Sequence, residues 1–298
     1  MPELPDVELY IFKLRPLVVG QPLLKLRTFT PFVLRTFSPS PADLQGKHVT
    51  GLRRLGKRIV FELEDDLFII VHLMIAGRFQ WKSDAPTGRP AGKIGLATFE
   101  FPTGSLILTE AGSKRRAGIY IVKGEEALKE HDPGGIELFE SSLAEFQRVL
   151  TQENRTVKRA LTNPHWFSGI GNAYSDEILH AAKLSPLKLT KSLSEDEVAR
   201  LYEATRQTLS KWQRALEIQF AKKFPGAGDV TAFRPDFAVH GKFGKPCPVC
   251  GKPVQRISYA DNEANYCAQC QNEGRLLADR SLSRLLKDDW PKTLEELE

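Results

Sequence analysis

The sequence predicts an α+β fold in which one helix and an antiparallel β-sandwich precede a helical domain that ends in a zinc ribbon. Three observations predict it. Residues 1–20 carry apolar side chains at helical spacing, and residues 25–123 consist of short alternating or apolar runs. Beyond residue 141 the spacing becomes helical again, and two Cys-x-x-Cys pairs follow it.

Length and charge set broad limits on function. The chain has 298 residues, enough for two domains with separate cores. Lys and Arg number 42 against 37 Asp and Glu, so the formal net charge is +5, which suits a polyanionic partner. The start lacks the basic segment of a secretory signal, and no apolar run approaches membrane-spanning length. We therefore expect a cytoplasmic protein.

The first helix is expected within residues 1–20. Pro5 suits a first helical turn, where the N–H that proline lacks would have no intrahelical partner. Apolar side chains then recur on one face, at Val7, Ile11, Leu14 and Val18. We expect the helix to stop at Gly20.

Six short runs predict the strands of the sandwich: residues 52–55, 58–63, 67–71, 97–101, 106–108 and 119–122. Turn residues separate several of these runs, at Asp65-Asp66 and at Thr103-Gly104. Residues 81–93 are rich in proline and glycine and predict a long loop. The pattern favours antiparallel strands in a sandwich or barrel.

Helical spacing defines the second half of the chain. Ser142 with Glu145, and Ser194 with Glu197, form capping boxes at two helix starts. The second of these helices is long, and its buried stripe is predicted to contain Val198, Leu201, Tyr202, Leu209, Trp212 and Leu216. The expected plan is a sandwich domain at 1–130, a linker at 131–141, a helical domain at 142–240, a zinc ribbon at 241–275 and an extension at 276–298.

The cysteine spacing predicts a metal site. Cys247 and Cys250 form one pair and Cys267 and Cys270 the other, and the chain has 4 cysteines in total. This spacing fits one tetrahedral zinc ion held by two short loops. Four thiolates leave no open coordination position, so we expect a structural Zn²⁺. A disulfide pair is the less favoured alternative in a chain without a secretory signal.

A second constellation contains Gly169-Ile170-Gly171-Asn172 between two helical stretches. We expect Asn172 to cap the helix that follows. Amide groups at a helix start, with Gly171 permitting close approach, would form a phosphate site. A simple glycine turn between packed helices is the alternative interpretation of these residues.

The N-terminus offers a nucleophile. If Met1 is removed, Pro2 presents a secondary amine, and α-amino groups have an ordinary pKa of about 7.7–8.0. The positive end of the first helix favours the neutral form of this amine. Neutral amines attack aldehyde-like carbons to form Schiff bases, and Glu3 could transfer the accompanying protons. The alternative is that Pro2 is a permissive second residue and Glu3 a helix-start acid.

These three elements together resemble the formamidopyrimidine-DNA glycosylase/endonuclease VIII family. The first eight residues, Met1-Pro2-Glu3-Leu4-Pro5-Asp6-Val7-Glu8, are similar to that family's N-terminus, although glutamate is usual at the position of Asp6. Gly169–Asn172 looks like its helix–two-turn–helix element, and the cysteines look like its zinc finger. The resemblance extends to about Gln271. It implies a bifunctional DNA glycosylase/AP lyase, with residues 1–130 as the catalytic domain.

The resemblance also implies roles for particular residues. Pro2 would attack C1′ of a flipped-out nucleotide, and Glu3 would handle proton transfer. Lys57, in the Leu55-Gly56-Lys57-Arg58 turn, would lie opposite the terminal amine as a second catalytic cation. Lys158 and Asn172 would hold the DNA backbone, with Gly171 letting a phosphate approach.

Two loops would fill the gap that the flipped base leaves. Ile75 stands where the family usually has a methionine wedge. Arg115 matches an arginine that pairs with the estranged base, and Ala117 stands where phenylalanine is usual. With no aromatic wedge, we expect weaker discrimination between opposite bases and tolerance of bubbles or single strands.

The zinc ribbon departs from the family as well. Asn262 occupies the place of an arginine that binds phosphate and serves δ-elimination, so we expect cleavage to stop more often at the β-elimination product. Lys242 and Arg256 are nearby in sequence and could substitute for that arginine.

The resulting hypothesis is a base-excision-repair enzyme that removes damaged bases, oxidised ones first among them. Its partner is damaged DNA, it binds no membrane, and we expect a monomer that is associated with the nucleoid when it is bound to DNA. One structural zinc is implied and no redox cofactor. The alternative is a non-catalytic damage-sensing or architectural DNA-binding protein on the same scaffold, which would not need Pro2, Glu3 and Lys57 together.

Overall fold

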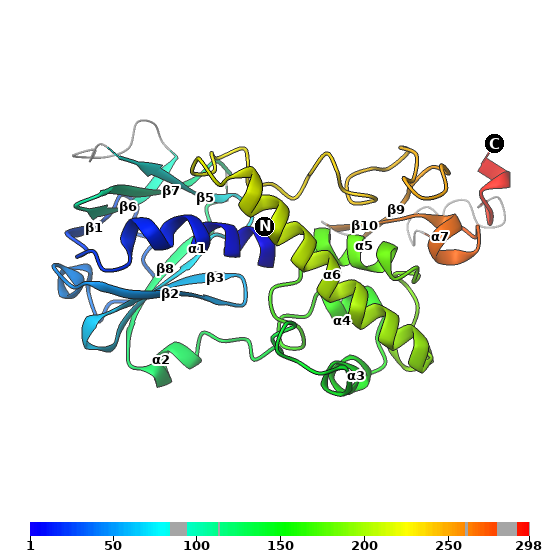
Figure 1. Cartoon of the computed structure of the whole chain (residues 1–298), viewed down its shortest axis with the longest axis horizontal. Helices are drawn as coiled ribbons and strands as arrows, with labels where there is room; N and C mark the ends of the chain where they lie inside the picture. Colours follow the sequence, from blue (N-terminus) through cyan, green and yellow to red (C-terminus); the bar gives the residue numbers. More distant parts are fainter. Residues whose placement is uncertain (84–93, 113, 260–261, 279–290, 298) are drawn as a thin grey trace. The chain divides into compact units, whose positions relative to one another are not determined.

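The computed structural model describes residues 1–83, 94–112, 114–259, 262–278 and 291–297, so most of the predicted 81–93 loop lies outside the described residues. The chain divides into two compact units (Figure 1). The first unit comprises residues 1–133 and 212–232, and the second comprises residues 134–211 and 233–298.

The first unit begins with helix α1, Leu4–Val18. The Glu3 backbone N–H donates to the Asp6 carboxylate at 2.9 Å, which caps the start of the helix. Val7, Leu14 and Val18 are completely buried, so the predicted apolar face of the helix is confirmed.

Among the described residues of this unit, eight strands follow α1, in two four-stranded antiparallel sheets with the orders β1-β6-β7-β5 and β2-β3-β4-β8. Their bounds are β1 Lys25–Thr28, β2 Val49–Leu55, β3 Arg58–Leu63, β4 Leu67–His72, β5 Gly77–Lys82, β6 Gly95–Phe101, β7 Gly104–Glu110 and β8 Gly118–Lys123. Short helices lie at η1 Pro41–Leu44, η2 Glu64–Asp66 and α2 Glu125–Lys129. The six predicted runs all fall on strands, whereas β1 and β5 were not among them.

The main core of this unit lies among α1 and the facing sides of both sheets. Phe61 on β3 stacks on Phe99 on β6 with ring centroids 5.6 Å apart, which joins the two sheets directly. Leu216 and Phe220 also belong to this core. Residues 212–232, which lie within the expected helical domain at 142–240, thus pack with the sandwich.

The second unit is helical, with a zinc ribbon. Its elements are α3 Leu143–Thr151, α4 Val157–Leu161, α5 Asn172–Ala181, η3 Thr190–Ser192, the part of α6 (Glu195–Gln219) that precedes residue 212, β9 Gln255–Tyr259, β10 Asn262–Tyr266, α7 Ala268–Asn272 and η5 Glu295–Leu297. Both predicted capping boxes lie at helix starts, where the hydroxyls of Ser142 and Ser194 accept N–H bonds from Glu145 and Glu197 at 3.2 Å. At the second start the Glu197 carboxylate also accepts from the Ser194 N–H at 2.9 Å, which completes the capping box there. The α+β fold class is thus confirmed.

The C-terminal extension returns to the ribbon. Leu294 is buried beside Ile257 and Tyr266 of the β9–β10 hairpin. The Leu276 N–H donates to the Lys292 carbonyl at 2.8 Å, so the described end of the chain is tied to the residues that follow α7. Nothing in the sequence pattern indicated this packing. In the described part of the chain, no helix is both long enough and apolar enough to span a membrane.

Candidate active site and zinc centre

The start of α1 holds the proposed catalytic acid. Pro2 is buried, and Glu3 is only 3% exposed. Its backbone is fixed by the hydrogen bond to Asp6, whose side chain is buried as well. The Glu3 carboxylate therefore lies in a desolvated site at the positive end of a helix.

A tight hairpin turn brings Lys57 to this site. Leu55 pairs with Arg58 across the β2–β3 ladder, so Gly56 and Lys57 form a two-residue turn. Gly56 has φ +60°, a conformation that glycine adopts without strain. Burial lowers the pKa of the Lys57 ammonium, and the charge of Glu3 acts in the opposite direction.

Glu3 and Lys57 also shift the pKa of the terminal amine. Burial is the main reason why the pKa of the Met1 amine is lowered, and Glu3 opposes that shift. Arg78 and Lys57 lower this pKa further, while Asp6 raises it. The Met1 amine stands one residue before the nitrogen that would be the nucleophile after removal of Met1. This environment favours the neutral form of an amine, which is the form that attacks carbon.

Arg54 was missed by sequence reasoning. Its guanidinium donates to the Glu8 carboxylate of α1 at 2.8 Å and to the Gly56 carbonyl at 3.0 Å. The side chain is 9% exposed. Arg54 thus ties the hairpin turn that carries Lys57 to the helix that begins at the amine. A basic residue shortly before a Gly-Lys turn was the available signal, but its partner Glu8 lies far away in sequence.

The residues of the two loops that would fill the gap left by a flipped base also lie in the first unit. Ile75 is 63% exposed in the turn between β4 and β5, and Arg115 is also exposed. A Cβ added to Gly112 would meet the Ala76 Cβ at 3.6 Å, so the two loops are adjacent. Ala117, by contrast, is buried and cannot project from the surface.

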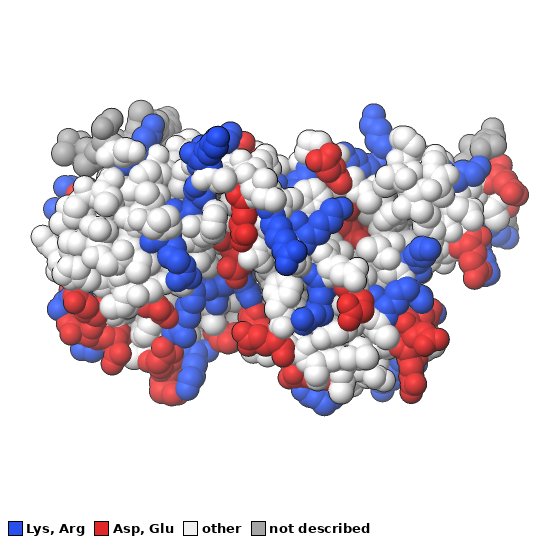
Figure 2. Space-filling view, viewed as in Figure 1, with Lys and Arg blue, Asp and Glu red and all other residues white. Residues whose placement is uncertain are grey.

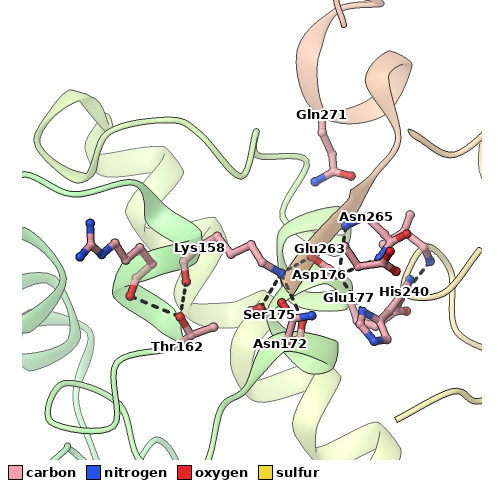
Figure 3. Close-up of polar contacts among 12 residues, drawn as sticks. Lys158, Thr162, Asn172, Ser175, Asp176, Glu177, His240, Glu263, Asn265 and Gln271 are labelled. Carbon is pink, nitrogen blue, oxygen red and sulfur yellow. Dashed lines mark hydrogen bonds and ion pairs between the residues drawn. The ribbon is translucent and has the colours of Figure 1, made fainter. Parts of the chain in front are cut away.

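A buried charge network organises the second unit (Figure 3). Lys158 of α4 is 4% exposed, and its ammonium contacts the Asp176 carboxylate, the Asn172 carbonyl and the Ser175 hydroxyl. The same Asp176 carboxylate accepts from the Asn265 backbone N–H at 3.1 Å. The ammonium of Lys158 therefore faces the interior, where Asp176 already compensates its charge.

The start of α5 differs from expectation. The helix begins at Asn172, and Gly171 is its N-cap with φ −132°, so Asn172 is the first helical residue rather than the cap. The Gly171 carbonyl accepts the first intrahelical bond, from the Ser175 N–H at 3.1 Å, and this places Gly171 at the N-cap. Asn172 remains half-buried. Gly169, with φ +83°, is the glycine of this motif whose conformation other residues rarely adopt.

Two neighbouring carboxylates of α5 hold the segment before the ribbon. The Glu177 carboxylate accepts backbone N–H bonds from Ala238, Val239 and His240 at 2.7–2.9 Å. Burial raises the pKa of Glu177, and these three N–H bonds act in the opposite direction. His240 Nδ1 lies 2.7 Å from the Asp176 carboxylate. Neither carboxylate was singled out from the sequence.

The four cysteines form the expected metal centre. Their sulfur atoms all lie within 4.8 Å of one another. A tetrahedral zinc ion with Zn–S bonds of about 2.3 Å separates its sulfurs by about 3.8 Å. The sulfurs of Cys247 and Cys270 are 3.9 Å apart and those of Cys250 and Cys267 are 3.4 Å apart, so the donor set fits one structural zinc.

The zinc centre contacts α5 directly. His180, near the end of that helix, is buried, and its Nε2 lies 3.3 Å from the Cys247 sulfur. Outer contacts of this kind orient metal ligands. Sequence reasoning did not assign His180.

The remaining ribbon residues are placed as follows. Asn262 is the first residue of β10 and pairs with Tyr259. The Arg256 guanidinium lies 4.5 Å from the centre of the Phe243 ring and 3.8 Å from the Glu263 carboxylate. The Lys242 ammonium donates to the Pro235 carbonyl at 2.6 Å. Both basic side chains thus already have protein partners.

Charge is mixed on the surface. Figure 2 shows basic and acidic side chains interspersed on the viewed face of each unit. The sequence-predicted residues form two sets: Pro2, Glu3, Lys57, Ile75 and Arg115 belong to the first unit, and Lys158, Gly171, Asn172, Lys242, Asn262 and the four cysteines belong to the second.

Comparison with known proteins gives a consistent result along the chain. The formamidopyrimidine-DNA glycosylase N-terminal domain matches residues 1–115, and the H2TH domain of that glycosylase matches residues 136–221. The zinc finger found in FPG and IleRS matches residues 244–272.

Whole proteins match over nearly their full length. A formamidopyrimidine-DNA glycosylase from Thermus thermophilus is 33% identical over 285 residues, which cover 92% of this chain and 100% of that protein. One from Lactococcus lactis subsp. cremoris is 28% identical over 284 residues, with coverages of 92% and 100%. A structure of Lactococcus lactis Fpg with DNA that contains an abasic site has a TM-score of 0.78 at 26% identity, and the match covers 91% of this chain and 99% of that one. The chain belongs to the formamidopyrimidine-DNA glycosylase family, whose members are DNA glycosylases with a C-terminal zinc finger.

Proposed function

We propose that this chain is a base-excision-repair glycosylase with AP lyase activity, acting through Pro2 on damaged and chiefly oxidised bases. The observation that carries the proposal is the N-terminal site, where burial and two cationic side chains lower the pKa of the terminal amine beside the buried Glu3. A binding protein has no need of such an amine. The names of the relatives and the abasic-site complex of Lactococcus lactis Fpg support the same function.

The chemistry follows from a neutral amine. With Met1 removed, the Pro2 nitrogen attacks C1′ of a flipped-out nucleotide, and the C1′–N bond breaks with its electron pair leaving on the base. Glu3 transfers protons as the sugar ring opens to give an iminium ion. Loss of a C2′ proton then expels the 3′ phosphate, and water hydrolyses the iminium to release Pro2. Lys57 positions a phosphate near this site and assists the strand cleavage.

The second unit supplies backbone contacts in this proposal. Asn172 contacts a phosphate at the start of α5, where helix amides favour anions. Gly171 lets that phosphate approach. Lys158 positions this turn from inside through the Asn172 carbonyl, because its buried ammonium already pairs with Asp176. Lys242 and Arg256 are the candidate basic contacts of the ribbon.

Borohydride trapping on abasic-site DNA tests the catalytic proposal. We expect a covalent adduct with the wild type and strongly reduced trapping with Pro2→Gly, while affinity for a tetrahydrofuran abasic analogue remains. The analogue has no aldehyde and serves as the matched control. Lack of an adduct with wild-type protein that mass spectrometry shows to begin at Pro2 would favour the non-catalytic DNA-binding alternative.

The ribbon provides a second test. Asn262 is neutral and cannot supply the proton or charge of an arginine, so we expect β-elimination products to predominate. Asn262→Arg should raise the share of δ-product on a sequencing gel. A wild type that yields only the δ-product would contradict this part of the proposal.

A further inference from the structure

The C-terminal extension lies beyond the part of the chain that the zinc finger match covers, which ends at residue 272. The Leu294 N–H donates to the Gly274 carbonyl at 3.1 Å, and Arg275 pairs with Thr293 in an antiparallel bridge. The last described stretch of the chain is thus paired, backbone to backbone, with the residues that directly follow α7.

The extension packs on one face of the β9–β10 hairpin. Side chains alternate between the two faces of a strand, and residues that pair across an antiparallel hairpin share a face. Because Ala264 pairs with Ile257, both share a face with Tyr266, which lies two positions further along β10. Leu294 joins Ile257 and Tyr266 in one buried apolar cluster. The extension therefore covers this face of the hairpin.

The opposite face of the hairpin is held by α5. The Asn265 side chain lies on that face, and its amide is 3.5 Å from the Asp176 carboxylate. The Asn265 backbone N–H donates to the same carboxylate at 3.1 Å. The hairpin thus lies between two other parts of the second unit, with α5 on one face and the extension on the other.

The strand that the extension covers carries a zinc ligand at one end. Cys267 comes immediately after Tyr266, the last residue of β10, and Asn262 is the first residue of that strand. The Leu277 N–H donates to the Tyr266 hydroxyl at 2.8 Å, so the backbone of the extension fixes this side chain as well. Contacts of the extension therefore act on the strand that joins Asn262 to the metal centre.

The extension is poorly suited to direct contact with DNA. Its described residues include one lysine, Lys292, and two exposed glutamates, Glu295 and Glu296. The negative charge of the glutamates repels phosphate groups. An effect of the extension on DNA binding would therefore pass through the hairpin.

We propose that the C-terminal extension is a brace that positions β10, and with it Asn262, for contact with DNA. Loss of the brace loosens the hairpin and frees the strand that leads into Cys267. The consequence for DNA binding rests on the proposed function. The consequences for the hairpin and for metal retention do not depend on it.

Leu294→Ala in the full-length, zinc-loaded protein tests the brace. Removal of this buried side chain should speed hydrogen exchange of the β9 and β10 amides on the order of tenfold or more. Zinc release to a chromogenic chelator should also become faster. Leu294→Met keeps the apolar contact and should resemble the wild type. Exchange of the β3 and β4 amides in the first unit is the internal reference and should not change.

Glu295→Ala is the matched control, because it truncates the neighbouring exposed side chain and should leave both rates unchanged. Rates in Leu294→Ala equal to those of the wild type would overturn the proposal, as would an equal acceleration in Glu295→Ala.

Fluorescence anisotropy with a duplex that contains the tetrahydrofuran abasic analogue measures the consequence for DNA. Leu294→Ala should raise the Kd about threefold or more, since roughly 0.7 kcal/mol of lost contact has this effect. Lys292→Ala should leave the Kd unchanged. An equal rise in Lys292→Ala would indicate direct phosphate contact and overturn the brace, and faster exchange in Leu294→Ala with an unchanged Kd would overturn the positioning role. Failure of borohydride trapping with the wild type would contradict the catalytic proposal alone, because the exchange and zinc-release comparisons do not involve DNA.

Discussion

Replacing Asp176 by asparagine should destabilise the second unit more than any surface substitution. The carboxylate is fully buried and contacts the Lys158 ammonium, His240 Nδ1 at 2.7 Å and the Asn265 N–H at 3.1 Å. Asparagine keeps the shape but leaves a buried ammonium without its counter-ion. Breaking one partner of a buried ion pair costs about 3–5 kcal/mol.

Urea denaturation followed by zinc release to a chromogenic chelator measures this loss, because the cysteines belong to the same unit. With a urea dependence of about 1–3 kcal/mol per M, the midpoint should fall by about 1 M or more. Glu273→Gln is the matched control. It removes an ion pair with Arg275 in which both side chains are more than two-thirds exposed, and its midpoint should not change.

A double variant separates the causes. Adding Lys158→Met to Asp176→Asn removes the unpaired ammonium, so part of the lost stability should return. An Asp176→Asn midpoint no lower than that of Glu273→Gln would refute the reasoning. If the double variant recovers nothing, the loss comes from the contacts of Asp176 with His240 and Asn265.

Three further predictions concern the metal and the first unit. Metal analysis should find one zinc per chain, and Cys270→Ser should lower both the zinc content and the affinity for DNA; active wild-type protein without zinc would contradict this. Arg54→Met should cost about 2–4 kcal/mol of stability and slow borohydride trapping, because it frees the hairpin turn from α1. Arg53→Met is its control, since Arg53 is 41% exposed, and equal slowing in both variants would exclude a special role for Arg54. Burial and the cationic neighbours Arg58 and Lys57 lower the pKa of His72 to about 4. Between pH 6.5 and pH 4 the unfolded chain therefore binds a proton that the folded chain does not. The free energy of unfolding falls by up to about 3 kcal/mol as the pH falls through this range. His72→Gln should remove that loss in pH-dependent denaturation, and an unchanged acid sensitivity would contradict the assignment.

Local chemistry was readable from the sequence. The Ser142 and Ser194 capping boxes and the two cysteine pairs each depend on residues a few positions apart. Strand β1 was missed because only Leu26 of its four residues is buried, which leaves no visible alternation. Strand β5 alternates more clearly, but its last two residues, Trp81 and Lys82, were assigned to the following loop.

Long-range partners were not readable. The apolar stripe of α6 shows that one face is buried, but periodicity cannot tell which core Leu216 joins. Likewise, the motif predicts a phosphate contact for Lys158, and nothing near it in sequence indicates that its ammonium pairs with Asp176. Arg54 and Glu8 meet only because α1 packs on β2, which no local pattern encodes.

The contacts of α5 connect the zinc centre to the start of that helix. Asn172, Asp176 and His180 are spaced four residues apart, so they lie along one face of α5. His180 contacts a zinc ligand, and Asp176 accepts from the β10 backbone. The ribbon therefore contacts α5 at Asp176 and at His180, one and two turns beyond Asn172 at the start of the helix. The buried apolar cluster around the cysteines is small, with Val239 and Val254 beside Cys247 and Cys267, so the shape of the ribbon depends on the metal. The orientation of the helix start, and with it any phosphate contact by Asn172, then depends on four cysteines that lie far along the chain.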